Sequence, residues 1–242
     1  MSTTPNATAT RLSLCRSAGR AGWLGLCLFA TLPAVRAADP CDELPKPSVT
    51  VKRIEKQPEL NLRYGYRSLT NLGGTQARPG RQILGLTRGN ASVSLGARTP
   101  LIVSADGRWE CASPQVTLTY GFAPITLYVA REFPPGTCAH KEILDHEQRH
   151  VDTYQAHLVA IEKTLTETLN QRFATTQPWR GPVGQVASQL QRELDQRWVP
   201  YVQREIRKVD AAQALIDTTE EYERVANACD GEISKRLKQG KP

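Results

Sequence analysis

A long amphipathic helix is the clearest pattern in this 242-residue chain. Between about residues 139 and 174, apolar side chains recur at steps of three and four, which places them on one helical face. These side chains are Ile143, Val151, Tyr154, Leu158, Ile161, Leu165 and Leu169. Because Pro134-Pro135-Gly136 precedes the segment, we expect the helix to begin near Thr137 or Ala139 and to end near Ala174.

Before this helix, residues 48–133 alternate between apolar and polar side chains, as half-buried strands do. The alternation is cleanest in Val116–Phe122, and Ile125–Val129 continues it. Weaker strand patterns lie at Val49–Val51, Leu60–Tyr66, Gln82–Thr87 and Ser92–Leu95. Between the last two of these, Arg88-Gly89-Asn90 predicts a hairpin.

Two more helices are expected after the first. They cover about residues 183–214, with a kink or break at Pro200, and about residues 217–237. The predicted fold class is therefore α+β. An N-terminal antiparallel β-rich lobe, residues 48–133, is followed by a helical lobe of three long helices, residues 137–238, and both belong to a single domain, residues 48–242.

The first 37 residues have the features of a secretory signal peptide. They begin with a basic region that lacks acidic residues, residues 21–32 are apolar but too short to span a bilayer, and Val35-Arg36-Ala37 fits a cleavage site. The alternative is an uncleaved N-terminal membrane anchor. We favour an exported protein, periplasmic or secreted, that has no stable membrane anchor and begins with a mobile Pro-rich leader, residues 38–47.

Removal of the signal peptide changes the charge of the chain. The formal net charge of +7 includes four arginines and no acids from residues 1–37, so it falls by four, to +3. Basic and acidic residues are mixed along the predicted helices, which indicates solvated faces rather than a stripe that binds nucleic acid. Nucleic acid is therefore not an expected partner, and the oligomeric state stays open.

Four cysteines remain after the signal peptide is removed: Cys41, Cys111, Cys138 and Cys229. In an exported protein they predict two disulfides, for which three connectivities exist. We favour Cys41–Cys111 within the β region and Cys138–Cys229 between the first and last helices. Closing a loop of about 90 residues, the second could add on the order of 4 kcal/mol of stability. A cysteine-ligated zinc is the alternative, and an oxidising compartment argues against it.

The first helix contains the sequence His146-Glu147-Gln148-Arg149-His150, which has the pattern H-E-x-x-H. Helical residues four apart lie on one face, about 5–6 Å from each other, so the two imidazoles could bind one zinc ion at about 2.0–2.1 Å. By helical phase, Glu147 falls in the middle of the apolar stripe and the histidines lie along its edge. A buried carboxylate is costly without compensation, which a metal with a bound water would supply. The alternative is a hydrogen-bonded polar cluster.

The H-E-x-x-H segment, preceded by a strand, resembles the zincin metallopeptidases. More narrowly, the chain is similar to uncharacterised bacterial proteins described as predicted secreted zinc-dependent proteases. The matching residues are His146, Glu147 and His150, followed by the apolar Val151. The resemblance implies that His146 and His150 are ligands of a zinc cofactor and that Glu147 deprotonates the zinc-bound water. It also implies a zincin-like domain.

A peptide or protein substrate follows from the same resemblance. In zincins a strand that precedes the active helix often holds the substrate backbone by β-augmentation, and here Ile125–Glu132 would be that strand. The chain also departs from the pattern. Zincins usually have an uncharged residue where this chain has Arg149, and Thr153 and Ala156 stand where a metzincin would need glycine and histidine.

The third zinc ligand is not obvious from the sequence. Zincins that use a glutamate take it from a later helix, which makes Glu221 the first choice; Glu205, Glu193 and His157 follow. Asp217 is not expected to bind metal, because with Glu220 it fits a capping box in which the aspartate is the N-cap. Tyr154, Tyr222 and His157 are the available side chains that could assist the chemistry.

Two functions from different classes remain. The first is an exported zinc-dependent peptidase with Glu147 as general base. The second is a non-catalytic exported zinc-binding module of the cell envelope, in which the metal is structural and the β lobe binds a partner. Structural zinc sites fill all four positions with protein ligands, so a fourth ligand would favour the second function. A third, weaker alternative is an exported helical protein with an accidental motif.

Overall fold

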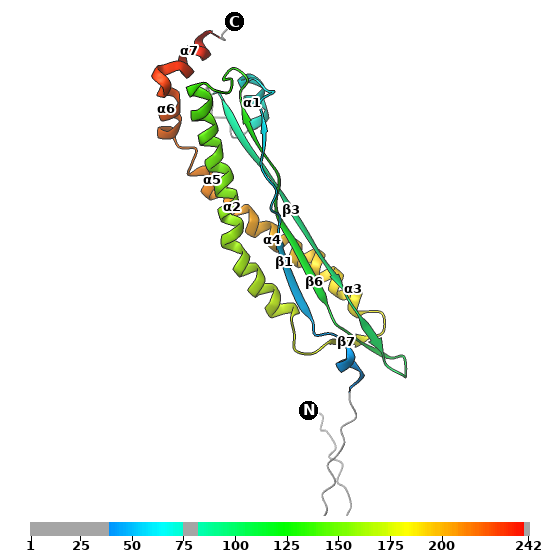
Figure 1. Ribbon diagram of the computed structural model, residues 1–242. Helices are drawn as coiled ribbons and strands as arrows, with labels where there is room; N and C mark the ends of the chain where they lie inside the picture. The colour runs from blue at the N-terminus through cyan, green and yellow to red at the C-terminus, as the bar shows by residue number, and fades with distance from the viewer. Residues whose placement is uncertain (1–38, 75–81, 240–242) are drawn as a thin grey trace, which may run out of the picture. The chain divides into compact units, whose positions relative to one another are not determined.

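The computed structural model describes residues 39–74 and 82–239 (Figure 1). By its internal contacts the chain divides into residues 1–37 and residues 38–242, and every element below belongs to the second unit. The predicted signal peptide and its cleavage site lie outside the described residues.

β6 (Gln115–Val129) is the central strand of the main sheet. On one side, β1 (Ser48–Arg53) and β2 (Glu59–Asn61) pair in parallel with successive parts of β6; on the other, β3 (Gly85–Arg98) pairs antiparallel along its length. The sheet is therefore mixed, and the prediction of an antiparallel β lobe is wrong. Parallel pairing requires a long crossover, and the chain between β1 and β6, which includes β3, provides it.

β3 and β6 are each continuous where the sequence indicated two strands. The hairpin predicted at Arg88-Gly89-Asn90 is wrong, because β3 runs through it with only a shift in register between Gly89 and Ala91. The shift also changes which positions of β6 face inward. Even-numbered apolar residues are buried before it and odd-numbered ones after it, namely Val116, Leu118, Tyr120, Phe122, Ile125, Leu127 and Val129.

α2 (Cys138–Phe173) is the predicted first helix, with its ends where the sequence placed them. Its N-cap is Thr137, whose hydroxyl accepts a hydrogen bond from the backbone N–H of His140. A short helix that the sequence did not indicate, α1 (Tyr66–Gly73), occupies part of the region expected to be β-rich.

The other two predicted helices are interrupted. The second consists of α3 (Val186–Glu193), a π-helical segment η3 (Leu194–Trp198), α4 (Val199–Arg207) and α5 (Val209–Ala214). The third consists of α6 (Thr219–Asn227), the 3-10 turn η4 (Cys229–Gly231) and α7 (Glu232–Gln239). The π-helical segment η3 ends two residues before Pro200, which has no N–H to continue the α-helical hydrogen bonds.

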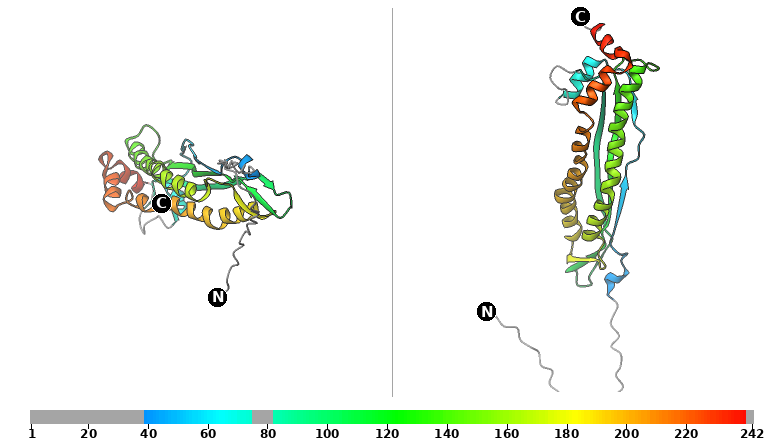
Figure 2. Two further views of the ribbon diagram at one scale, coloured as in Figure 1. Left: turned by 90° about the horizontal axis from the view of Figure 1, so that it is seen from below. Right: turned by 90° about the vertical axis from the view of Figure 1, so that its left-hand side faces the viewer.

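α2 and the α3–α5 segment lie against one face of the main sheet (Figure 2). Apolar side chains from β3, β6, α2, η3 and α4 form the larger core between these layers, among them Leu118, Phe122, Val151, Leu165, Leu194 and Val202. A second core joins α1, the end of β6, the start of α2 and the C-terminal helices, through Tyr66, Val129, Ile143, Val225 and Ile233. This second core places α6 and α7 beside the part of α2 that carries the motif.

A smaller antiparallel sheet is formed by β4 (Leu101–Val103), β5 (Trp109–Ala112) and β7 (Trp179–Pro182), in the order β4-β5-β7. The predicted mobile leader includes the 3-10 helix η1 (Pro40–Glu43), and the Cys41–Cys111 disulfide bonds it to β5. Part of the leader is therefore fixed covalently to this sheet.

Both favoured disulfides, Cys41–Cys111 and Cys138–Cys229, are present. The second joins the first residue of α2 to η4, between α6 and α7. Two disulfides are typical of proteins that fold in an oxidising compartment. Within the described residues, no helix has both the length and the apolar character needed to cross a membrane.

Glu110 of β5 is a buried carboxylate that stabilises the turn before α3. Only 1% of its surface is exposed, and it accepts hydrogen bonds from the backbone N–H groups of Gly184 at 2.8 Å and Val186 at 2.9 Å. Glu110→Ala would leave both donors without their partner, so we expect it to lower the free energy of unfolding by about 1–3 kcal/mol. Urea denaturation of the oxidised protein measures this loss.

Two variants control the experiment. Glu110→Gln keeps one acceptor and should lose less stability, whereas Glu59→Ala on the exposed surface of β2 should change it by less than about 0.5 kcal/mol. Equal stability of Glu110→Ala and Glu59→Ala would contradict the assigned role.

Candidate metal centre

His146, Glu147 and His150 are buried on the inner face of α2. Their exposed fractions are 7%, 3% and 8%. Ile143 and Val151, on the same side of the helix, are packed into the two cores, and this packing fixes the rotation of α2. The inward phase predicted from the sequence is therefore present in the fold.

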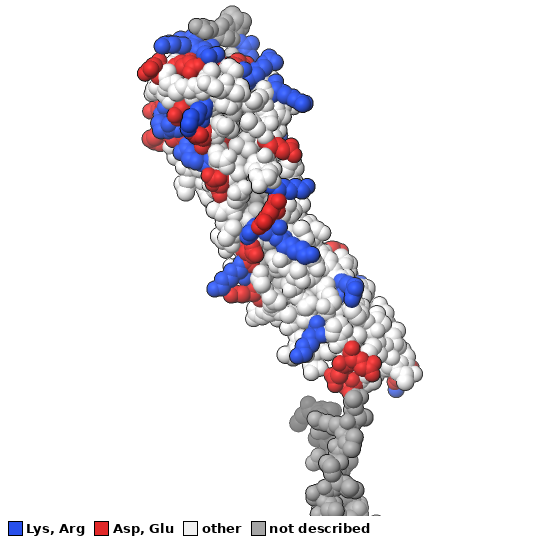
Figure 3. All heavy atoms as spheres, in the orientation of Figure 1, with Lys and Arg blue, Asp and Glu red and all other residues white. Residues whose placement is uncertain are grey.

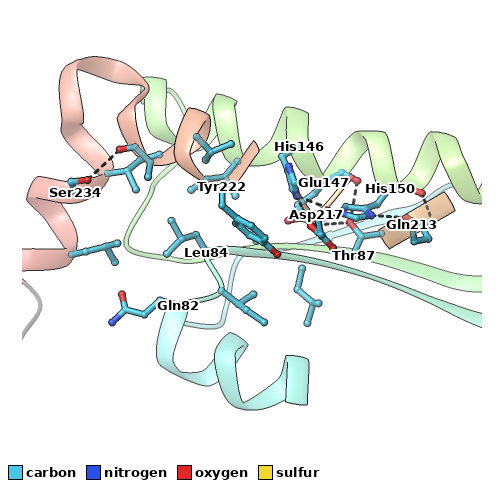
Figure 4. Close-up of a pocket in the computed structure, with 18 of the residues that line it drawn as sticks. Gln82, Leu84, Thr87, His146, Glu147, His150, Gln213, Asp217, Tyr222 and Ser234 are labelled. Atoms are coloured by element: carbon cyan, nitrogen blue, oxygen red, sulfur yellow. Dashed lines mark hydrogen bonds and ion pairs between the residues drawn. The ribbon is translucent and has the colours of Figure 1, made fainter. Parts of the chain in front are cut away.

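Asp217, between α5 and α6, meets both imidazoles (Figure 4). The Nε2 atoms of His146 and His150 are 3.3 Å apart, and Oδ1 of Asp217 lies 3.2 Å from the first and 3.3 Å from the second. Donors bound tetrahedrally to zinc at about 2.0–2.1 Å lie about 3.3 Å from one another. These three atoms thus have the spacing of a zinc site, and the group could hold a metal ion.

Polar contacts at the two outer ring nitrogens hold both imidazoles with Nε2 towards the centre of this group. Nδ1 of His150 lies 2.5 Å from Oε1 of Gln213, whose Nε2 donates to the backbone carbonyl of His150 at 3.0 Å. Nδ1 of His146 lies 3.2 Å from Oε1 of Glu221. The amide oxygen of Gln213 can only accept, so Nδ1 of His150 donates and its Nε2 is an acceptor, which is the tautomer a metal ligand needs. Nδ1 of His146 lies between the Glu221 carboxylate and Nη2 of Arg149, which is 3.0 Å away and is a donor.

The electrostatics of the group also favour a cation. Burial opposes the charge of His146 and His150, but hydrogen bonding to Asp217 and the nearby Glu147 outweigh it and raise the pKa of both imidazoles. Burial likewise opposes the charge of Asp217, and its hydrogen bonds to the two histidines outweigh it and lower its pKa. The cluster is therefore stabilised by positive charge, which protons or a metal ion can provide.

The structure corrects the predicted capping box. The N-cap of α6 is Thr218, whose hydroxyl accepts a hydrogen bond from the backbone N–H of Glu221. The helix thus begins one residue later than expected, at Thr219. Asp217 precedes the cap, and its carboxylate faces the two histidines instead of the helix end.

The ranking of the third ligand is corrected as well. Glu221, the first choice, contacts the outer nitrogen of His146 rather than the Nε2 centre. The other candidates are bound elsewhere: Glu205 pairs with Lys208, Glu193 with Arg172 and Trp198, and Nε2 of His157 lies 2.9 Å from the carbonyl oxygen of Glu205. Within the described residues, Asp217 is the carboxylate that completes the group.

Arg149, the residue that departs from the zincin pattern, supports the histidines from outside. It forms an ion pair with Glu221, and Arg224 donates to both oxygens of the same carboxylate at 2.9 and 3.0 Å. Hydrogen bonds from Arg224, then from Arg149 and His146, outweigh burial and lower the pKa of Glu221 to about 2. On the face seen in Figure 3, basic and acidic side chains are intermixed over this region. Glu221 is thus a fixed anion that holds His146.

Glu147 is positioned by β3. The hydroxyl of Thr87 lies 2.8 Å from Oε2 of Glu147 and 3.1 Å from its backbone carbonyl oxygen. A Cβ atom on Gly85 would lie only 2.4 Å from Oε1 of Glu147, so the absence of a side chain at Gly85 makes room for the carboxylate. Burial raises the pKa of Glu147, and the two imidazoles and Thr87 oppose this shift.

A cavity of about 480 Å³ opens beside these groups. It is enclosed by β3, the motif face of α2 and the C-terminal helices, and Figure 4 shows Tyr222 and Leu84 in it. A second, polar hollow of about 250 Å³ continues along β3 and shares Thr87 and Tyr154 with the first. The candidate centre therefore lies in a groove that follows β3.

The strand expected to bind substrate, Ile125–Glu132, does not offer a free edge. Its residues up to Val129 belong to β6, which pairs with β2 through Thr126–Tyr128 and with β3 through Ile125–Val129. That prediction is wrong, because β6 is central in the sheet. Within the described residues, the strand beside the motif with a single partner is β3.

Sequence reasoning missed four residues of this site: Gly85, Thr87, Gln213 and Asp217. Gly85 and Thr87 follow a weak strand pattern with no local signal for contact with α2. Asp217 carried a signal, an acidic residue before an amphipathic helix, but the same pattern fits an N-cap aspartate, which is the role that the sequence predicted for it. Only the tertiary fold separates these alternatives.

Comparison with known proteins found no match: no family model matches the chain, and no curated protein or solved structure is significantly similar to it. The resemblance to zincins is therefore limited to the motif. The functional argument depends on the geometry of the site.

Metal binding by the cluster is tested with paired variants. We expect wild type to bind about one zinc ion per chain. His150→Ala or Asp217→Ala should lower the affinity for zinc by more than about 100-fold, because each removes one of three donors. The controls are His157→Ala on the same helix and Asp210→Ala on α5. Elemental analysis and competition with a chelator give stoichiometry and Kd. Loss of binding in Glu221→Ala, but not in Asp217→Ala, would reject Asp217 as a ligand.

The two disulfides should affect the metal differently. Cys138–Cys229 ties η4, which follows α6, to the start of α2, whereas Cys41–Cys111 ties η1 to the small sheet. Both double cysteine-to-serine variants should lose about 4 kcal/mol of stability at most, but only Cys138→Ser/Cys229→Ser should bind zinc more weakly. Chelator competition under conditions where both variants are folded measures the difference. Equal zinc affinities would contradict it.

Proposed function

We propose that this chain is an exported zinc-dependent peptidase. The observation that carries the proposal is the convergence of His146 Nε2, His150 Nε2 and Asp217 Oδ1 at mutual distances of 3.2–3.3 Å beside the buried Glu147. Export is supported by the two disulfides and by the signal-peptide pattern of residues 1–37.

Zinc fits the donor set. Two imidazole nitrogens and one carboxylate oxygen form a set that catalytic zinc sites use, in which the fourth position is left for water or substrate. Structural sites are instead filled by four protein ligands, mostly cysteine. The four mature cysteines are paired in disulfides, and the described cluster contains three donors. The set therefore favours catalysis over a structural staple.

A zinc ion bound there would polarise a substrate carbonyl and lower the pKa of water to about 7. Glu147 then takes a proton from the attacking water, whose oxygen adds to the peptide carbonyl carbon. As the carbon–nitrogen bond breaks, Glu147 gives that proton to the leaving amine. Burial suits the residue to both steps, because a raised pKa lets its carboxylate hold the proton and still release it.

Thr87 and Gly85 keep this base in place. Thr87 donates to Oε2 of Glu147. The other carboxylate oxygen, Oε1, lies beside Gly85, where there is no side chain. Of the candidate assisting residues, Tyr222 lines the cavity with its ring centre 6.2 Å from that of His146, whereas His157 is bound to the carbonyl of Glu205. We assign Tyr222 as the hydrogen-bond donor to the developing oxyanion, with Tyr154 as the second candidate.

The role of Glu147 is tested by Glu147→Gln. The amide cannot accept a proton from water, so we expect zinc binding to be retained and peptide hydrolysis to fall by about 10²- to 10⁴-fold. Glu167→Gln, an exposed glutamate of α2, is the matched control. Cleavage of a mixed peptide library by the zinc-loaded protein, followed by mass spectrometry, measures turnover.

The outcomes separate the two functions. Equal activity of Glu147→Gln and wild type would show that Glu147 is not the base. One tightly bound zinc per chain without cleavage of any library peptide would favour the non-catalytic zinc-binding module instead.

A further inference from the structure

The smaller of the two spaces along β3, called the polar hollow from here on, is lined by three elements. Leu72 and Gly73 of α1, residues 87–90 of β3 and Tyr154 of α2 surround about 250 Å³. Apart from Leu72, these residues offer glycines, backbone and side chains with polar groups. The hollow therefore suits a polar group of a ligand, in contrast to the larger cavity, whose lining includes many apolar side chains.

Close contacts hold both sides of the hollow against β3. On the α1 side, Oγ1 of Thr70 accepts a hydrogen bond from the backbone N–H of Ile83 at 2.9 Å, and a Cβ atom on Gly73 would lie 2.2 Å from Cδ1 of Ile83. On the α2 side, a Cβ atom on Gly89 would lie 3.0 Å from Cζ of Tyr154. The hollow is therefore built by elements that are packed closely on one another.

The same contacts interrupt the open edge of β3. The N–H of Ile83 is bound by Thr70, and the backbone of Gly89 is hydrogen-bonded to the hydroxyl of Tyr154. An added peptide strand needs a run of free backbone groups, and this edge is occupied at both positions. Recognition of a substrate at the hollow therefore depends on side chains.

Thr87 and Arg88 connect the hollow to the proposed base. The hydroxyl of Thr87 lies 2.8 Å from Oε2 of Glu147, and Thr87 lines both spaces. Arg88 follows it at the spacing of strand residues, about 3.3 Å, and its side chain leaves β3 on the opposite face. Because both residues line the hollow, the hollow extends around the edge of β3 from one face to the other. A group bound by Arg88 would therefore belong to a substrate residue close to the bond that Glu147 attacks.

Arg88 is a cation to which no carboxylate side chain of the protein is paired. All Asp and Glu residues of the chain lie within the described ranges, 39–74 and 82–239, and none of them forms an ion pair with Arg88. Among the residues that line the hollow, Arg88 alone carries a charge. Burial and the negative charge of Asp210 on α5 raise the pKa of Tyr154, but Asp210 does not line the hollow. An anion that binds to Arg88 would therefore displace no internal partner.

We propose that the polar hollow binds a carboxylate of the substrate through Arg88. This specificity rests on the proposed peptidase function. The planar guanidinium matches the two oxygens of a carboxylate, and the side-chain amide of Asn90 is a further donor in the lining. The carboxylate belongs either to an Asp or Glu side chain of the peptide or to the C-terminus of the peptide, and each source requires a different set of substrates.

Arg88→Gln tests the proposal, because it removes the charge but keeps a polar side chain. We expect it to lower kcat/KM for peptides that carry the carboxylate by about tenfold, and to change kcat/KM for their amide counterparts by less than about twofold. Arg88→Lys keeps the charge without the planar fork, so it should lose less than Arg88→Gln. The matched control is Arg98→Gln, which changes an exposed arginine at the end of the same strand.

Two series of peptides distinguish the sources of the carboxylate. In the first series Asn and Gln replace Asp and Glu, and in the second the C-terminus is amidated. Slower cleavage in the first series assigns the hollow to an acidic side chain, and slower cleavage in the second assigns it to the C-terminus. Mass spectrometry locates each cleaved bond. Added salt should weaken either preference, because it screens the exposed ion pair.

Several results would overturn the inference. Equal cleavage of all three forms of the peptides by wild type, or equal effects of Arg88→Gln and Arg98→Gln, would contradict it while leaving peptidase activity established. If wild type cleaves nothing, the peptidase proposal fails, and binding of fluorescent peptides to zinc-loaded Glu147→Gln then tests the hollow by itself. Acidic peptides should bind more tightly than their amide counterparts, and Arg88→Gln should remove this difference. Equal Kd values for the two kinds of peptide would reject recognition of a carboxylate.

Discussion

The structure of the site depends on three electron-pair donors that point at one another. Two buried imidazole nitrogens and the oxygen of a half-buried carboxylate, each about 3.3 Å from the others, are costly to hold together unless positive charge lies among them. Gln213 and Glu221 fix the outer nitrogens and so prevent the rings from turning their lone pairs away. Because a cation satisfies all three donors together, metal binding is expected to be coupled to the stability of this region.

The donors come from parts of the chain that are held by different forces. His146 and His150 belong to one helix, whose register is fixed by the core against β3 and β6. Asp217 lies on a connection attached to that helix by the Cys138–Cys229 disulfide, the Arg224–Glu142 ion pair and the apolar contacts of Val225 and Ile233. The histidine pair is thus preformed by helical geometry, and the affinity of the centre depends on how firmly the C-terminal segment is held.

Sequence reasoning succeeded where one local rule decided the outcome. The period of apolar residues predicted α2 and its inward face, and the expectation of export made the four cysteines after residue 37 predict both disulfides. Sequence reasoning failed where contacts between distant segments determine the structure. Alternation does not show whether neighbouring strands run parallel, so β1 and β2 were misassigned. Asp217 and Glu221 lie one turn apart, and the choice between them depends on where α6 begins, which Thr218 sets.

The five-residue motif can form a metal site in unrelated folds, so a chain can contain it without any wider similarity to zincins. Spacing of i and i+4 on a helix brings two histidines to one ion in any fold, so the five residues carry local geometry and no information about the remaining fold. What a fold must add is a third donor, a positioned base and access for substrate. In this chain the candidates for these three are Asp217, Glu147 held by Thr87 beside Gly85, and the cavity along β3. Asp217 belongs to the connection between α5 and α6, Thr87 and Gly85 belong to β3, and the cavity is formed jointly by β3, α2, α6 and α7. Their joint presence beside the motif is more specific than the motif itself, and this coincidence is the reason for proposing catalysis.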